Sequence, residues 1–123
     1  MGYYTDYSLD VREIKDQNQF DDLVMELKKL DLVRSVFDEG RYNSDRHDAY
    51  FSCYEEAKWY NHAKDMLHIS EKFPNMYFEL EGNGEEFGDF WREYWHDGEC
   101  EACRGEIVYE QPKKIPWQEL GAF

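Results

Sequence analysis

Two segments of the chain carry apolar or β-prone side chains at every second position. In residues 3–11 these side chains stand at the odd positions, and polar residues such as Asp6 and Asp10 stand between them. Residues 76–81 alternate in the same way. A period of two is typical of strands with one buried and one solvated face. The sequence therefore predicts a sheet with one side on a core and the other in water.

Two other segments have helical spacing. Residues 18–30 repeat apolar side chains three and four positions apart, and Asn18 is placed to cap the first turn. Residues 61–73 repeat the pattern, with Asn61 as the cap and Pro74 as the stop signal. We expect helices over both segments.

The aromatic runs at 49–60 and 90–96 predict further strands, although residues 54–58 could equally form a helical turn. The dipeptide Asp97-Gly98 suits a two-residue type I′ hairpin, which would lead into a last strand ending near Tyr109.

The expected order is therefore β-α-β-α-β-β-β. Residues 32–37 could extend the first helix or start a strand, and residues 38–48 are polar and turn-rich, so we expect a mobile loop there. Two helices on one face of an antiparallel sheet is the economical packing, an α+β fold. A length of 123 residues has room for one domain, 1–123, with residues 111–123 as a surface tail.

The net charge of the chain disfavours some classes of function. The chain has 28 acidic and 14 basic residues, a formal charge of −14, which disfavours direct binding to nucleic acid or to an anionic membrane. The aromatic content of 18% argues against disorder. No apolar run suits a membrane span or a signal peptide, and the three cysteines fit a reducing compartment. We expect a cytoplasmic protein.

The acidic excess is concentrated in residues 79–110, where eleven acids and two bases give a local charge of −9. Aromatic residues are interleaved with these acids. Because neighbours on a strand point to opposite faces, either Trp91 with Trp95 or Phe90 with Tyr94 faces away from the core. A surface that combines aromatics with carboxylates is suited to a basic protein groove. The predicted partner-binding residues are Glu79, Glu81, Glu85, Glu86, Asp89, Trp91, Glu93, Tyr94, Trp95, Asp97 and Glu99.

Two interpretations of this segment stay open. In one, the carboxylates imitate the phosphates of a nucleic acid and occupy the basic channel of a nucleic-acid-processing enzyme. In the other, the charge only solvates a compact domain, and the extra aromatics pack beneath the tail, for instance under Ile115 and Trp117.

Zinc binding is an alternative function. Cys100 and Cys103 form a C-x-x-C with His96 nearby, and Cys53 or His47 would have to supply a fourth ligand. Their odd spacing on a strand would put the two cysteines on opposite faces. No motif marks a catalytic nucleophile, a phosphate loop or an EF-hand. We therefore expect no enzyme activity, no metal and no cofactor.

The stretches MGYYTDYSL, KWYNHAKDM and KFPNMYFELEGNGEEFGDFWREYWHDG resemble small acidic proteins of tailed-phage and mobile-element genomes. The resemblance implies an inhibitor of the anti-CRISPR or anti-restriction kind, which would bind and block a host nucleic-acid-processing protein in the host cytoplasm. It implies no catalytic residues. A homodimer, or a self-associating phage structural or assembly protein, is a further alternative.

Overall fold

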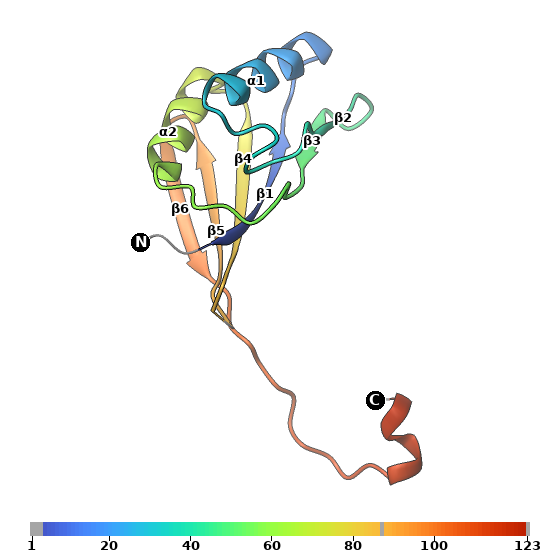
Figure 1. Cartoon of the computed structure of the whole chain (residues 1–123). Coiled ribbons are helices and arrows are strands. Elements are labelled where there is room, and N and C mark those ends of the chain that lie inside the picture. Colours follow the sequence, from blue (N-terminus) through green and yellow to red (C-terminus); the bar gives the residue numbers. More distant parts are fainter. Residues whose placement is uncertain (1–3, 87, 123) are drawn as a thin grey trace.

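The computed structural model describes residues 4–86 and 88–122. Within them, six strands form one sheet in the order β2-β3-β1-β4-β5-β6, and every neighbouring pair is antiparallel (Figure 1). The elements are β1 (Thr5–Arg12), α1 (Gln17–Lys29), β2 (Arg41–Asn43), β3 (Asp48–Phe51), α2 (His62–Lys72), β4 (Tyr77–Gly84), β5 (Phe90–His96), β6 (Glu99–Arg104) and the 3₁₀ helix η1 (Trp117–Ala122).

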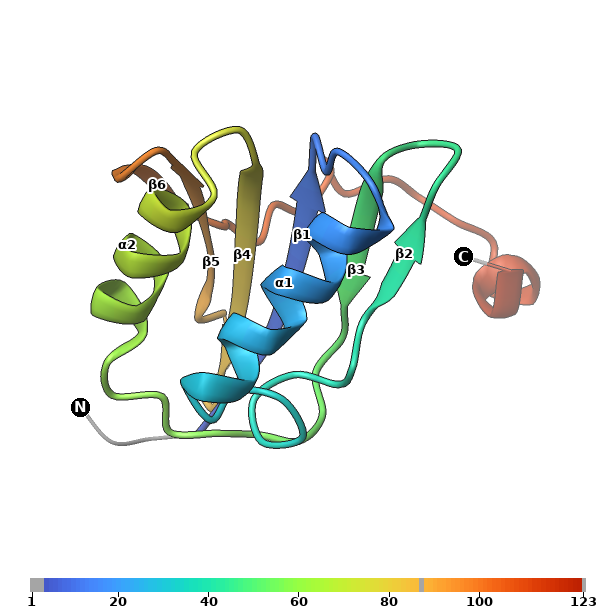
Figure 2. The ribbon, with the colours of Figure 1, turned by 90° about the horizontal axis from the view of Figure 1, so that it is seen from above.

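Both α-helices of the described chain lie on the same face of the sheet (Figure 2). The elements from β1 to β4 make two split β-α-β units, and β5 and β6 extend the sheet beyond β4. The predicted α+β fold, with an antiparallel sheet and two helices on one side, is confirmed.

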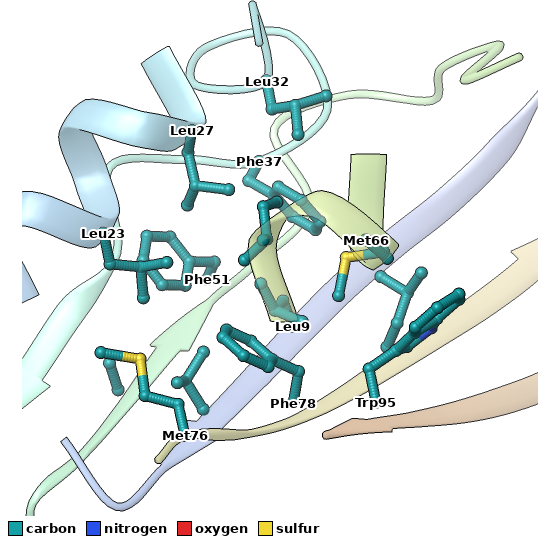
Figure 3. Close-up of a cluster of buried hydrophobic side chains, with 14 of the residues drawn as sticks. Leu9, Leu23, Leu27, Leu32, Phe37, Phe51, Met66, Met76, Phe78 and Trp95 are labelled. Carbon is teal, nitrogen blue, oxygen red and sulfur yellow. The ribbon is translucent and has the colours of Figure 1, made fainter. Parts of the chain in front are cut away.

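The core lies between this sheet and the two helices. Leu23 of α1 and Met66 of α2 are fully buried against strand residues such as Leu9 and Phe78 (Figure 3). The odd positions of β1 all point into this layer, as their alternation predicts, and the even positions point away. Tyr3, where we expect the first strand to begin, lies outside the described residues.

The structure differs from the sequence prediction at the edges of the sheet. Residues 38–48, expected to be a loop, contain β2, which forms a hairpin with β3. The strand expected over 49–60 ends at Phe51, and the last strand ends at Arg104, before Tyr109. Trp59 in the aromatic run at 49–60 is buried in the core outside any strand, so an aromatic run indicates burial and not strand length.

Local contacts explain these ends. The backbone N–H of Ser52 donates to Asp38 Oδ1 at 3.1 Å, which turns the chain out of β3. Beyond β6, Val108 and Tyr109 are more than four-fifths exposed, so no packing holds them in the sheet.

The predicted caps and turns differ in accuracy. Asp16, and not Asn18, caps α1, because Asp16 Oδ1 accepts the N–H of Gln19 at 2.9 Å. Asn61 caps α2 by position, without a side-chain hydrogen bond. The Asp97-Gly98 turn is confirmed: both residues have positive φ, 45° and 81°, as a type I′ turn requires.

The tail leaves the sheet after β6 and extends away from it (Figure 1). Trp117 is 77% exposed, and the tail does not cover the aromatics of the sheet. No helix in the described chain is long and apolar enough to cross a membrane.

Candidate functional site

The sheet face opposite the helices, which we call the open face, carries most of the acidic side chains of the strands and several of their aromatic rings. The register assigns residues to this face, because directly paired residues share a side. Its carboxylates are those of Asp6, Asp10, Asp48, Glu79, Glu81, Glu99 and Glu101, and its guanidinium groups are those of Arg12, Arg41 and Arg92. Its rings are those of Tyr50, Tyr77, Phe90, Tyr94 and His96.

One row of the open face crosses five strands. Asp10 of β1 pairs with Tyr50 on one side and with Glu79 on the other, and Glu79 pairs with Tyr94, which pairs with Glu101. Side chains at such positions lie about 5 Å apart at Cβ. The row therefore places the adjacent carboxylates Asp10 and Glu79 between two phenol rings, with Glu101 beyond the second ring.

Like charges are crowded around Asp10 on the open face. Desolvation raises the pKa of Asp10, and the neighbouring carboxylates of Asp48 and Glu81 raise it further, while Arg12 acts in the opposite direction. The open face therefore carries unfavourable repulsion when its acids are ionised.

Arg92 partly offsets this repulsion at the centre of the face. Its guanidinium lies 3.9 Å from Glu79 Oε2 and 3.7 Å from Glu81 Oε2. The hydrogen bond with Tyr94, and then these two carboxylates, raise the pKa of Arg92. One cation serves two acids at the surface of the sheet, and such pairs stabilise weakly and are screened by salt.

A hollow of about 250 Å³, the open-face notch, lies over β4, β5 and β6. Its side chains on this face are those of Arg12, Tyr77, Tyr94, His96, Glu99 and Glu101. Tyr77 stacks on His96 with ring centroids 3.8 Å apart and an interplanar angle of 3°. The notch thus joins aromatic surface to two carboxylates.

The predicted partner-binding residues fall into three groups. Glu79, Glu81, Tyr94 and Glu99 lie on the open face. Glu85, Glu86 and Asp89 lie in the turn between β4 and β5, and Asp97 lies in the turn between β5 and β6. Trp91, Glu93 and Trp95 point to the helix side, where Trp95 is only 7% exposed.

The outward aromatic pair is therefore Phe90 with Tyr94. Sequence reasoning did not select Asp10, Tyr50 or Tyr77, which belong to the same face. The polar even positions of β1 were a usable signal for Asp10. The alternation of residues 76–81 was a usable signal for Tyr77, because it groups this residue with Glu79 and Glu81. Tyr50 had no such signal, since an exposed aromatic on a short strand resembles a buried one.

The cysteines do not form a common site. Cys100 pairs with Trp95 on the helix side, and Cys103 pairs with Arg92 on the open face. Desolvation and then the Asp6 carboxylate raise the pKa of the Cys53 thiol. Among the residues that the structure describes, no group of three or more His, Cys, Asp or Glu side chains is placed to hold a metal ion.

Comparisons with protein-family models, with curated proteins and with solved structures found no match for this chain. The function therefore has to be inferred from the chemistry of the open face itself.

Proposed function

We propose that the protein is a non-catalytic binding protein whose open face docks on a basic protein surface. The observation that carries the proposal is the excess of carboxylates over guanidinium groups on a sheet face that nothing in the described chain covers. Complementary charge steers association, and half-exposed tyrosines supply the anchors that slow dissociation.

The proposed partner is a host nucleic-acid-processing protein with a basic groove. Carboxylates two positions apart on one strand lie about 6.7 Å apart, and neighbouring strands lie about 4.8 Å apart, so the sheet holds a fixed array of negative charges. Such an array can replace phosphates in a groove lined by Lys and Arg. The resemblance to phage inhibitors suggests that blocking this groove counters a host defence.

The open-face notch is the proposed anchor point for one Arg or Lys side chain of the partner. Glu99 and Glu101 outnumber Arg12 there, and no salt bridge engages these two acids in the described chain. The exposed ring of Tyr94 offers a cation-π surface beside them. A guanidinium in the notch would combine both interactions.

This charge disfavours a homodimer formed by two open faces, because two identical acidic surfaces repel each other. A mass measurement in solution tests this alternative. A dimeric mass at low salt would support the homodimer.

Capture from a host lysate at about 50 mM and 500 mM NaCl tests the proposal. The protein should recover a nucleic-acid-binding protein at low salt and much less at high salt, and added duplex DNA should compete. The triple variant Asp10→Asn, Glu99→Gln, Glu101→Gln should lose recovery at least tenfold.

The matched control is Asp21→Asn, Asp22→Asn, Glu56→Gln, which changes the net charge equally at exposed positions outside the open face. Equal recovery by the two triple variants, or recovery that ignores salt, would refute docking through the open face.

A further inference from the structure

A second hollow of about 690 Å³, the side pocket, lies on the helix side of β5 and β6. It exists because the sheet is wider than its helical layer. Six strands span about 24 Å, whereas two helices of about 10 Å diameter cover about 20 Å. Every residue of β6 is exposed, including those that face the helix side. The volume is in the range of small-molecule sites.

Aromatic rings form the wall of the side pocket. Trp91 lies 5.9 Å from Tyr7 and 5.6 Å from His62 between ring centroids, and Trp59 lies 5.8 Å from His62. Trp91 reaches this position because its pairing partner is Gly82, where a Cβ would come within 2.2 Å of the indole. The wall is thus built of flat surfaces suited to stacking.

The polar groups inside are already satisfied. Glu93 accepts a hydrogen bond from Trp95 Nε1 at 3.0 Å and lies 2.9 Å from His62 Nε2. Burial raises the pKa of Glu93, but these two contacts outweigh it and leave the pKa below its ordinary value. Glu93 is therefore an ionised carboxylate whose two oxygens are both engaged.

Basic side chains stand at the mouth. Lys58 and Arg104 line the pocket and are both exposed. Arg104 lies 3.3 Å from Asp89, and Lys58 lies 4.8 Å from the ring of Tyr4. Glu93 is the only acid among the described residues that line this hollow. The lining of this aromatic cavity therefore holds more basic than acidic side chains, in a chain with twice as many acids as bases.

We propose that the side pocket binds a planar aromatic anion of nucleotide size, with its ring against Trp91 and its anionic group between Lys58 and Arg104. Base-aromatic stacking and charge-assisted hydrogen bonds are the interactions that such walls and such a mouth provide. A cationic ligand fits less well, because Lys58 and Arg104 repel it and both oxygens of Glu93 already have partners within the protein. The site lies on the opposite side of β5 from the open face and is independent of the proposed docking.

NMR titration of the whole protein with adenosine monophosphate and, separately, with indole-3-acetate tests the proposal. The indole N–H resonance of Trp91 should shift on binding, and that of Trp117 in the tail should not. The two probes distinguish a nucleotide site from a site for aromatic carboxylates, and a shift with either supports the proposal.

Two comparisons identify the binding groups. Adenosine without phosphate, and the variant Lys58→Ala, Arg104→Ala with the monophosphate, should each bind about tenfold more weakly or worse. Ala102→Phe should abolish the Trp91 shift, because the new ring fills the hollow from an exposed position. Val108→Phe is the control, since it adds the same ring at an exposed position outside the lining of the side pocket.

Failure of both probes to shift Trp91 would overturn the proposal, as would unchanged binding by a folded Ala102→Phe protein. Equal affinity for adenosine and its monophosphate would overturn the role of the anionic group. None of these outcomes bears on capture through the open face.

Discussion

At the scale of single residues, the buried acid Glu26 joins the two helices through its contacts with basic side chains. Its side chain is buried between the helices, with His68 Nε2 at 2.6 Å, Lys72 Nζ at 3.3 Å and Lys29 Nζ at 3.8 Å. The hydrogen bond with His68 is the main cause that lowers the pKa of Glu26, burial opposes it, and Lys72 lowers it further. A lowered pKa in the folded state means that ionised Glu26 stabilises the fold.

We expect Glu26→Gln to reduce the free energy of unfolding at pH 7 by about 1 to 2 kcal/mol, because hydrogen bonds to a charged group are lost while the half-exposed partners regain water. The wild-type protein has this extra stability at pH values above the ordinary glutamate pKa of about 4.3. It loses the extra stability as the pH falls through the lower pKa that Glu26 has in the folded protein. Urea denaturation at pH 7, 5 and 3 measures the difference. A difference in the free energy of unfolding that is as large at pH 3 as at pH 7 would contradict a stabilising role of ionised Glu26. The substitution of the exposed residue Glu55 by Gln serves as the control.

At the scale of elements, the pairing of β4 with β5 fixes what each face presents. Gly82 faces Trp91 across the two strands, and the indole occupies the space that a larger residue would need. This contact sets the wall of the side pocket and, through the alternation of β5, turns Arg92 and Tyr94 outward.

Replacing Gly82 with Ala should push the Trp91 ring away from β4 and lower stability by about 1 to 3 kcal/mol, the usual cost of overpacking. Thermal denaturation measures the loss, and the indole N–H resonance of Trp91 reports the displacement. The neighbouring substitution Asn83→Ala, on the open face of the same strand, should change neither. A Gly82→Ala protein with wild-type stability and an unmoved Trp91 signal would show that the ring has room elsewhere.

The elements differ in how far the sequence could predict them. β1, α1, α2 and β4 carry one continuous apolar stripe each, and a stripe of fixed period is visible in sequence. β2 is three residues long, and in it only Tyr42 packs against the core, so it carries too little pattern to detect. β6 has no buried side at all, so its end depended on hydrogen bonds and not on hydropathy.

The candidate site was predictable only in part for the same reason. The acidic residues between positions 79 and 110 can be read directly from the sequence. Alternation along one strand also shows that either Trp91 with Trp95 or Phe90 with Tyr94 faces outward. Which pair points outward depends on the partner strand, where Gly82 leaves room for the Trp91 indole on the helix side. The contribution of Asp10 and Tyr50 arises from register between distant segments, which no local pattern contains.

At the scale of the whole molecule, the excess of acids costs stability. The formal charge is −14, and the open face concentrates part of it on one side. Added salt weakens such repulsion, because exposed charges more than about 8 Å apart are largely screened at physiological ionic strength. The fold should therefore be more stable in salt than in dilute buffer.

We expect the melting temperature at pH 7 to rise by several degrees between about 10 mM and 500 mM NaCl. Asp10→Asn should raise the melting temperature in dilute buffer and make it respond less to salt, because the raised pKa of Asp10 means that its ionised form disfavours folding. Calorimetry of both proteins provides the measurement, with Asp22→Asn as the exposed control. A melting temperature that falls with NaCl would mean that attractive ion pairs, and not repulsion, dominate the surface.

The strict alternation of β5 has a genetic consequence. Its successive side chains serve two unrelated environments, Trp91, Glu93 and Trp95 toward the helices and Arg92 and Tyr94 toward solvent. Inserting or deleting one codon within this strand would turn every later side chain of the strand to the opposite face of the sheet. A guanidinium group would then point into the hydrophobic layer. A substitution in this strand changes one of the two environments, whereas a change of length alters both, so length variation has to be confined to the turns that flank it.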